Sequence, residues 1–388
     1  MPALARFLIL LIAGFVTAAS IGELVPHVSW LVETYGISLG LAGVLVSGVM
    51  LPGVIAGWGL GVLVDRFGPA RIAIAALALQ ALASLGFAWA DGFWTLLALR
   101  LVEGIGYILF VVAATVLVIA VSDARRRGLA LSVWSAYAPV GFALGQWASA
   151  AAGGADRLAA IGDWHAAMLG VSALLLAVAL PRDFRGARRY PGGTSASVLR
   201  HAPAVRAAAA FGSSVGVLLA AVALAPVVLA ASADLTVPET ARLTALAALP
   251  GIFGRFASGW LLDRGLVPLN VFGTAGVVGA IFFLVGLLSP VPFTLALACF
   301  GLFQIAIGVL PGVLSAMLPA VSPTPEQLGA VSGLSMQMVT LGNLLGPPLA
   351  LSVYATAGAA AATAMLVAVI AASVALIATL AVFRTAQR

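Results

Sequence analysis

Long apolar runs separated by short polar breaks occupy nearly the whole chain. Most runs reach the ~20 apolar residues that a helix needs to cross the hydrocarbon core of a bilayer. Turn-forming residues and charges gather in the breaks, as at Asp91-Gly92. The pattern predicts twelve spanning helices, at residues 4–27, 39–63, 71–90, 94–121, 129–152, 164–181, 205–231, 241–262, 269–289, 292–319, 328–352 and 359–383.

One polar segment, at residues 182–204, is longer than the other breaks and lies halfway along the chain. Six predicted spans precede it and six follow it. We therefore expect an all-α membrane protein built from two six-helix bundles. The N-terminal bundle is predicted over 1–181, a cytoplasmic central loop over 182–204, and the C-terminal bundle over 205–388.

Composition supports lipid as the solvent. Of 388 residues, 63% are hydrophobic and 8% are charged. A soluble domain carries roughly 25% charged residues, and disordered chains have low hydrophobicity, so both classes are excluded. The first apolar run lacks the small-residue cleavage site of a secretory signal, and we expect it to be retained as a span.

Arginine supplies all 19 basic residues, and its distribution predicts an orientation. An even number of spans places both termini on one side, and fifteen arginines fall on that side. Arg157 and Arg242 fall on the opposite side, while Arg100 and Arg255 lie inside spans. The positive-inside rule makes the arginine-rich side cytoplasmic. We expect a multi-pass protein of a bacterial cytoplasmic (inner) membrane with both termini in the cytoplasm.

Several kinds of chemistry find no support in this sequence. The net charge of +6 is dispersed and forms no basic face, so nucleic acid is not an expected partner. The chain has no lysine for a phosphate-binding loop, and its single Cys299 excludes an internal disulfide. His27, His165 and His201 are placed in or beside loops without forming a cluster. We expect no metal site, no cofactor and no enzyme nucleophile.

Parts of the first half recur in the second half. A shift of 198 residues aligns a Leu-Pro-Gly triplet and an Asp-Arg pair, and a shift of 201 aligns three glycines. The matches are Leu51-Pro52-Gly53 with Leu249-Pro250-Gly251, Asp65-Arg66 with Asp263-Arg264, and Gly128, Gly141 and Gly145 with Gly329, Gly342 and Gly346. Two parallel six-span repeats are typical of two-bundle secondary transporters, whose binding site lies near the midplane between the halves.

Residues 61–71 join the second and third predicted spans and read Gly-Val-Leu-Val-Asp-Arg-Phe-Gly-Pro-Ala-Arg. A glycine allows close helix approach, and an aspartate can accept hydrogen bonds from free N–H groups of a neighbouring helix. Such a contact can form when the cytoplasmic side is shut and break when it opens. The spacing resembles the loop signature of the major facilitator superfamily. The expected gate residues are Gly61, Asp65, Arg66 and Arg71, with Asp263 and Arg264 as their copy; a plain positive-inside loop is the alternative.

Residues 100–106 read Arg-Leu-Val-Glu-Gly-Ile-Gly and resemble a second signature of the same family, an intramembrane arginine followed by Gly-x-Gly. A charge at membrane depth costs about 2.5–3.5 kcal/mol on insertion scales, so Arg100 should point into the bundle or a wet cavity. Glu103 lies on the same helix face, and Glu23 lies at a similar depth where it can pair with Arg100. The three form either a proton-coupling or gating network or a static ion pair.

Arg255 lies in the eighth predicted span, eight residues and therefore about 12 Å before Asp263 along a helix. No acidic residue of that span shares its face, and the guanidinium fork suits a carboxylate ligand. The Gly-Arg pair followed by this aspartate resembles organic-anion carriers of the superfamily, such as the oxalate/formate exchangers. The resemblance implies that Arg255 binds the anion. Alternatively, Arg255 snorkels toward the cytoplasm or pairs with Glu103 or a backbone carbonyl.

Six further polar or aromatic residues lie at midplane depth in their predicted spans. They are candidates for lining a substrate cavity, and packing between helices is the alternative role for each. These residues are Tyr107, Trp134, Tyr137, Gln304, Gln337 and Asn343.

The repeat and the resemblance together predict a monomeric secondary transporter of the major facilitator superfamily that works by alternating access. The expected cargo is a small organic anion, moved by exchange or with protons, and the lipid bilayer is the other partner. The alternative is proton-coupled export of lipophilic drugs or metabolites, with Glu23, Arg100 and Glu103 as coupling groups. A third hypothesis is a signalling receptor with this fold, which the lack of a soluble output segment in the sequence disfavours.

Overall fold

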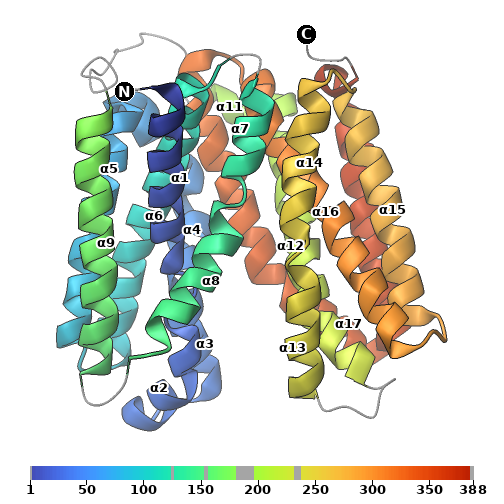
Figure 1. The fold of residues 1–388 in the computed structure, drawn as a ribbon, viewed down its shortest axis with the longest axis horizontal. Helices are drawn as coiled ribbons and strands as arrows, with labels where there is room; N and C mark the ends of the chain where they lie inside the picture. The colour runs from blue at the N-terminus through green and yellow to red at the C-terminus, as the bar shows by residue number, and fades with distance from the viewer. Residues whose placement is uncertain (1, 124–125, 153–155, 181–195, 231–236, 385–388) are drawn as a thin grey trace. The chain divides into compact units, whose positions relative to one another are not determined.

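The computed structural model describes residues 2–123, 126–152, 156–180, 196–230 and 237–384. Every regular element in these ranges is a helix (Figure 1). The chain divides into two compact units, and both are discontinuous in sequence. Unit 1 comprises Met1–Asp123, Ala136–Val198 and Thr324–Gln337; unit 2 comprises Ala124–Ser135, Leu199–Pro323 and Met338–Arg388. Each unit thus includes a short segment from the opposite half of the chain.

The division of the chain into an N-terminal bundle over 1–181 and a C-terminal bundle over 205–388 stays a prediction. Most of the predicted central loop lies outside the described residues. Its last part was predicted wrongly, because Ser197–Arg200 and the residues from Ala202 onward are helical.

Unit 1 is built around a central helix, α6. Helices α1, α4 and α5 pack against α6, and α9 packs against α1 and α5. The elements of this unit are α1 (Ala3–Ala19), η1 (Val25–His27), α2 (Val28–Tyr35), α3 (Leu39–Ser47), η2 (Gly48–Met50), α4 (Leu51–Phe67), α5 (Pro69–Leu85), η3 (Gly86–Trp89), α6 (Phe93–Val121), α8 (Tyr137–Ser149), α9 (Arg157–Ala179) and η5 (Pro325–Gln327).

Unit 2 has α16 as its central helix, in contact with α7, α12, α13, α14 and α15. Its elements are α7 (Arg127–Trp134), α12 (Ala202–Ala230), α13 (Val237–Ala248), α14 (Gly251–Asp263), α15 (Pro268–Leu288), α16 (Phe293–Val321) and η6 (Ala381–Phe383). The short α11 (Ser197–Arg200) and the long α17 (Leu328–Ala378) have residues in both units.

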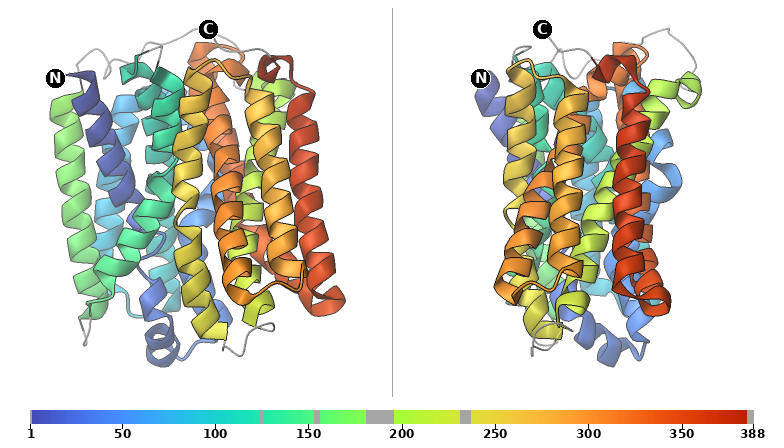
Figure 2. Two further views of the ribbon diagram at one scale, coloured as in Figure 1. Left: turned by 45° about the vertical axis from the view of Figure 1, so that its right-hand side comes forward. Right: turned by 90° about the vertical axis from the view of Figure 1, so that its right-hand side faces the viewer.

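Ten stretches among the described residues are long and apolar enough to cross a membrane. The last of them, Pro325–Ala378, contains two helices that meet at Gly358, where φ is +82°. Glycine adopts this left-handed backbone without a Cβ clash, which permits the reversal. Figure 2 shows the part after Gly358 (red) running back through unit 2, where Ser373 bonds to Ser213 of α12 and Val374 lies near Gly276 of α15.

The apolar helix α1 adds a further span, so the prediction of a twelve-helix all-α membrane fold is confirmed. Large apolar side chains cover the outer surface; Trp147 is 80% exposed and Trp94 is 78% exposed. Surfaces of this kind are rare on soluble monomers and suit contact with lipid.

Two spans of unit 1 are interrupted, where the sequence predicted continuous helices. The first span, predicted over 4–27, stops as α1 at Ala19, and Glu23 lies in the turn before η1. The second span contains the short η2 between α3 and α4. Interruptions free backbone carbonyls that a regular helix would use internally. One side chain, Arg100, donates to carbonyls at both interruptions.

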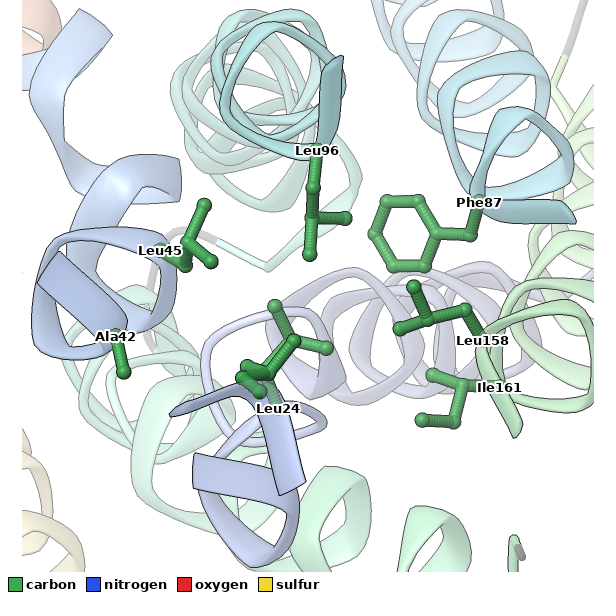
Figure 3. Close-up of a cluster of buried hydrophobic side chains, with 8 residues drawn as sticks. Leu24, Ala42, Leu45, Phe87, Leu96, Leu158 and Ile161 are labelled. Carbon is green, nitrogen blue, oxygen red and sulfur yellow. The ribbon is translucent and has the colours of Figure 1, made fainter. Parts of the chain in front are cut away.

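A cluster of buried apolar side chains packs together in unit 1 beside these interruptions (Figure 3). Its residues come from the α1–η1 turn, α2, α3, η3, α6 and α9. They are Leu24, Leu31, Ala42, Leu45, Phe87, Leu96, Leu158 and Ile161. Because Leu24 directly follows Glu23, this apolar cluster borders the charged residues described next.

Candidate functional site

Four ionisable side chains meet inside unit 1 and none of them is exposed. We call this set the ionic cluster. Glu23 comes from the turn after α1, Arg100 and Glu103 from α6, and His165 from α9. Buried charges are stable only when they are paired and hydrogen-bonded, so the contacts of each member decide what the cluster can do.

Arg100 contacts both carboxylates of the cluster. Its Nη1 donates to Glu23 Oε1 at 2.7 Å and to Glu103 Oε2 at 2.5 Å. Its Nη2 donates to the Ser20 carbonyl at 2.6 Å and to the Val46 carbonyl at 3.3 Å, and its Nε donates to the Leu45 carbonyl at 3.2 Å. One guanidinium therefore ties α6 to the interrupted first and second spans.

His165 faces the same two carboxylates from the other side. Its Nδ1 lies 2.8 Å from Glu23 Oε2 and 3.3 Å from Glu103 Oε1. Its Nε2 lies 3.0 Å from the carbonyl of Val16 in α1. Ser84 of α5 donates its hydroxyl to Glu103 Oε1 at 3.2 Å. The cluster thus joins α1, α5, α6 and α9.

The placement of His165 corrects the sequence prediction. The sixth span was predicted to begin at residue 164, because Arg157 and Asp163 resemble loop residues. The helix begins instead at Arg157, so His165 lies about 12 Å inside it. Glu23, Glu103 and His165 bring ligand-type atoms within 4.8 Å of one another, and the expectation that no such group exists was wrong. Arg100 already supplies the cation that both carboxylates bind.

Asp65 lies in the last turn of α4, rather than in a loop as predicted, and it caps α17. Its Oδ1 accepts from the Gly329 N–H at 2.7 Å and its Oδ2 from the Ala330 N–H at 2.8 Å. The first N–H groups of a helix lack internal partners, and a carboxylate also complements the helix dipole. A Cβ at Gly61 would overlap the Gly329 carbonyl oxygen, so glycine permits this approach.

Asp263 makes the corresponding contact in unit 2. It ends α14, and its Oδ2 accepts from the Leu129 N–H of α7 at 3.2 Å. A Cβ at Gly259 would lie 2.6 Å from Leu129 Cα, so close approach again requires glycine. The two caps are formed by residues that the internal repeat relates. The neighbouring arginines of the expected gate, Arg66, Arg71 and Arg264, are exposed.

Gln337 binds to the backbone of α4. Its Oε1 accepts from the Trp58 N–H at 3.1 Å, and its Nε2 donates to the Val54 carbonyl at 2.9 Å. Nearby in unit 1, the hydroxyls of Tyr107 and Tyr137 lie 3.4 Å apart. These three candidates for a substrate cavity therefore take part in helix contacts.

Arg255 lies in α14 with 9% of its surface exposed, and its Nη1 donates to the Ser135 carbonyl at 2.7 Å. Ser135 follows the last residue of α7, Trp134, which is also buried. Gln304 of α16 is 1% exposed, and its Nε2 has no hydrogen-bond partner among the described residues. Asn343 of α17 is half-buried. These four candidates belong to unit 2, whereas Tyr107, Tyr137 and Gln337 belong to unit 1.

A family model described as Major Facilitator Superfamily matches residues 10–311. The chain belongs to this superfamily. It is a multi-pass membrane protein of a transporter family. The aspartate cap at Asp65 and the ionic cluster at Arg100 lie in the two sequence motifs that resemble the signatures of this superfamily.

Curated relatives of this superfamily member include transporters of organic acids. The chain is 28% identical to the 4-hydroxybenzoate transporter PcaK of Pseudomonas aeruginosa over 389 aligned residues, covering 91% of this chain and 79% of the relative. A probable 4-methylmuconolactone transporter of Cupriavidus pinatubonensis is 34% identical over 117 residues, 30% of this chain and 26% of the relative.

Solved structures of the superfamily share the fold. The human organic anion transporter MFSD10 superposes with a TM-score of 0.74 over 97% of this chain and all of that chain, at 18% sequence identity. At that identity the likeness extends to the fold alone.

Proposed function

We propose that the protein is a secondary transporter that moves a small carboxylate-type organic anion across a bacterial cytoplasmic membrane. Transport proceeds by alternating access, either by exchange or with proton coupling. The arginine distribution supports cytoplasmic termini. The observation that carries the substrate class is the buried guanidinium of Arg255 in α14.

Arg255 suits this role because a guanidinium offers a planar fork of N–H donors that matches a carboxylate. Its bond to the Ser135 carbonyl orients the side chain at the break that follows α7. Gln304 adds a buried amide on α16, a helix that packs against α14. The relatives named for 4-hydroxybenzoate and 4-methylmuconolactone support organic acids as the class of cargo.

The two aspartate caps are the proposed gates. Each carboxylate holds the first turn of a helix from the other half of the chain, through hydrogen bonds that can break when the helices part. Glycines at the same contacts allow the backbones to meet closely.

The test is counterflow of labelled 4-hydroxybenzoate in proteoliposomes, with competition by benzoate, an aliphatic monocarboxylate and the neutral 4-hydroxybenzamide. We expect the acids to compete and the amide not to. Arg255→Gln should raise the KM for the anion by about 10–100-fold, the value of a hydrogen bond to a charged group. Arg206→Gln, which removes an exposed arginine of α12, is the charge-matched control.

An unchanged KM in Arg255→Gln would reject Arg255 as the anion site. The alternative, proton-coupled export of lipophilic compounds, predicts a different pattern. Cells that overproduce the protein would then tolerate lipophilic drugs better, and proteoliposomes would show no carboxylate counterflow.

A further inference from the structure

The contacts of His165 require a proton on either His165 Nδ1 or Glu23. The Val16 carbonyl can only accept, so the Nε2 of His165 at 3.0 Å carries a hydrogen. The Nδ1 lies 2.8 Å from Glu23 Oε2. A bare ring nitrogen and a bare carboxylate oxygen repel each other at that distance. Either Nδ1 also carries a proton, or Glu23 does and donates it to Nδ1.

Both arrangements give the ionic cluster the same total charge. Arg100 contributes one positive charge and the shared proton a second, while Glu23 and Glu103 contribute two negative charges. The sum is zero, as a fully buried site requires. Loss of the shared proton would leave one uncompensated negative charge among α1, α5, α6 and α9.

Among the groups around His165, the shared proton is the one that the cluster can release. Its charged neighbours are Glu23 and Glu103, with Arg100 bonded to both from the opposite side. The other polar group at Nδ1 is the Ser84 hydroxyl of α5, at 3.3 Å. Arginine does not deprotonate in proteins. The titration therefore belongs to the His165–Glu23 pair.

We propose that the His165–Glu23 pair is a proton-binding site, and that one proton bound there travels with each organic anion. This inference rests on the proposed function for its cargo. The sealed cluster holds the proton; when water reaches the pair, the Nδ1···Oε2 contact breaks and the proton passes to water. Glu23 lies in the non-helical turn after α1, where the chain can move without breaking a helix. A proton and a monocarboxylate together carry no net charge.

The chain offers a matched control in its other buried histidine. His27 is 3% exposed, and its Nε2 lies 3.0 Å from the Ser149 carbonyl, as the Nε2 of His165 does from that of Val16. Only His165 forms a carboxylate contact at Nδ1 within the described residues. Glutamine replaces the Nε2 donor of histidine and removes Nδ1. Both substitutions thus keep a donor for the carbonyl at Nε2, and His165→Gln also removes an Nδ1 that contacts carboxylates.

Uptake of 4-hydroxybenzoate driven by an inward proton gradient is measured beside counterflow, which needs no net proton movement. With the membrane potential clamped, a one-unit pH difference should give wild-type accumulation of up to about tenfold. The ratio of driven uptake to counterflow should fall by up to about tenfold, to the uncoupled level, in His165→Gln and Glu23→Gln and stay at the wild-type value in His27→Gln. Driven uptake that persists in both cluster variants would overturn the proposal.

Nitrogen-15 NMR of histidine-labelled protein tests the proton without any substrate. The chain has three histidines, so His165→Gln assigns the signal. At neutral pH His165 should show a protonated Nε2 and an Nδ1 that carries or shares a proton, and Glu23→Gln should shift Nδ1. An Nδ1 signal of a bare imidazole nitrogen, unmoved by Glu23→Gln, would overturn the site. Absent counterflow in the wild type would reject the cargo instead, and this spectrum would still decide the proton site.

Discussion

The helix pairs α5–α6 and α15–α16 occupy equivalent places in the two repeats, yet they bury opposite chemistries. Helices α6 and α16 both have 29 residues, and a shift of 200 residues aligns Arg100 with Phe300 and Glu103 with Phe303. In unit 2 the ring centroids of Phe303 lie 4.5 Å from Phe283 and 6.0 Å from Phe300. One helical frame thus carries ions in unit 1 and stacked aromatic rings in unit 2.

The ionic cluster of unit 1 has two protonation states, whereas the aromatic stack of unit 2 has none that can change. Aromatic burial does not depend on protonation, because it rests on apolar area and ring geometry. The ionic cluster is neutral only while it holds its proton. By contrast, the caps at Asp65 and Asp263 keep the same chemistry in both repeats. This is the pattern expected of the transporter proposed above, with a single coupling site and two gates.

The largest expected effect comes from breaking the ionic cluster. Arg100→Met should lower the free energy of unfolding by about 3–5 kcal/mol, because Glu23 and Glu103 would stay buried without a cation. The loss should shrink as the pH falls, since protonation neutralises both carboxylates. Denaturant unfolding in detergent micelles at two pH values measures it.

Removing the carboxylates as well supplies the control. Arg100→Met combined with Glu23→Gln and Glu103→Gln should recover most of the loss, because no unpaired charge remains. If Arg100→Met unfolds as the wild type does at neutral pH, the cluster is not sealed and the contrast with unit 2 fails.

An intermediate effect is expected at the contacts that both repeats keep. Gly61→Ala should destabilise by about 1–3 kcal/mol, because its Cβ would overlap the Gly329 carbonyl oxygen. Gly259→Ala should have the same sign, since its Cβ would lie 2.7 Å from Ser132 Cβ. Thermal unfolding is the measurement.

Gly59→Ala is the matched control on the same helix, because its Cβ would meet no atom within 4 Å. There, alanine should stabilise α4 by about 0.5–1 kcal/mol. Equal effects at Gly59 and Gly61 would show that close helix approach is not what the glycine provides.

The smallest effect is expected in the aromatic stack. Phe303→Leu should cost about 1–1.5 kcal/mol, because a somewhat smaller apolar side chain replaces the ring in an unchanged apolar site. The cost should be the same at both pH values, unlike that of Arg100→Met. A pH-dependent loss in Phe303→Leu would remove the distinction between the two helix pairs.

The sequence alone predicted much of this architecture because lipid imposes a strong, local constraint. A span must be apolar over ~20 residues, so hydropathy places the helices. Arg100 and Glu103 could be paired from their spacing, because residues three apart share a helix face. The repeated Asp-Arg pair likewise identified both caps.

Contacts between distant residues could not be read in the same way. Gln337 binds Val54 and Trp58, and nothing in its own span specifies α4 as the partner. The interruption after Ala19 carries Gly22, Glu23 and Pro26, but these lie in an apolar run long enough to read as one span, and nothing in them specifies Arg100 and His165 as the partners of Glu23.

Composition and hydropathy thus determined the solvent and the approximate spans of this protein, and its two signature motifs carried the resemblance to the family, because those properties are written residue by residue along the chain. Only the tertiary structure decided that His165 joins Glu23, Arg100 and Glu103. Charges near the start of a span look like loop residues until packing shows that the helix has already begun. The proposed proton on the His165–Glu23 pair follows from interatomic distances that join α9 to α1 and to the turn after α1, and no local pattern encodes those distances.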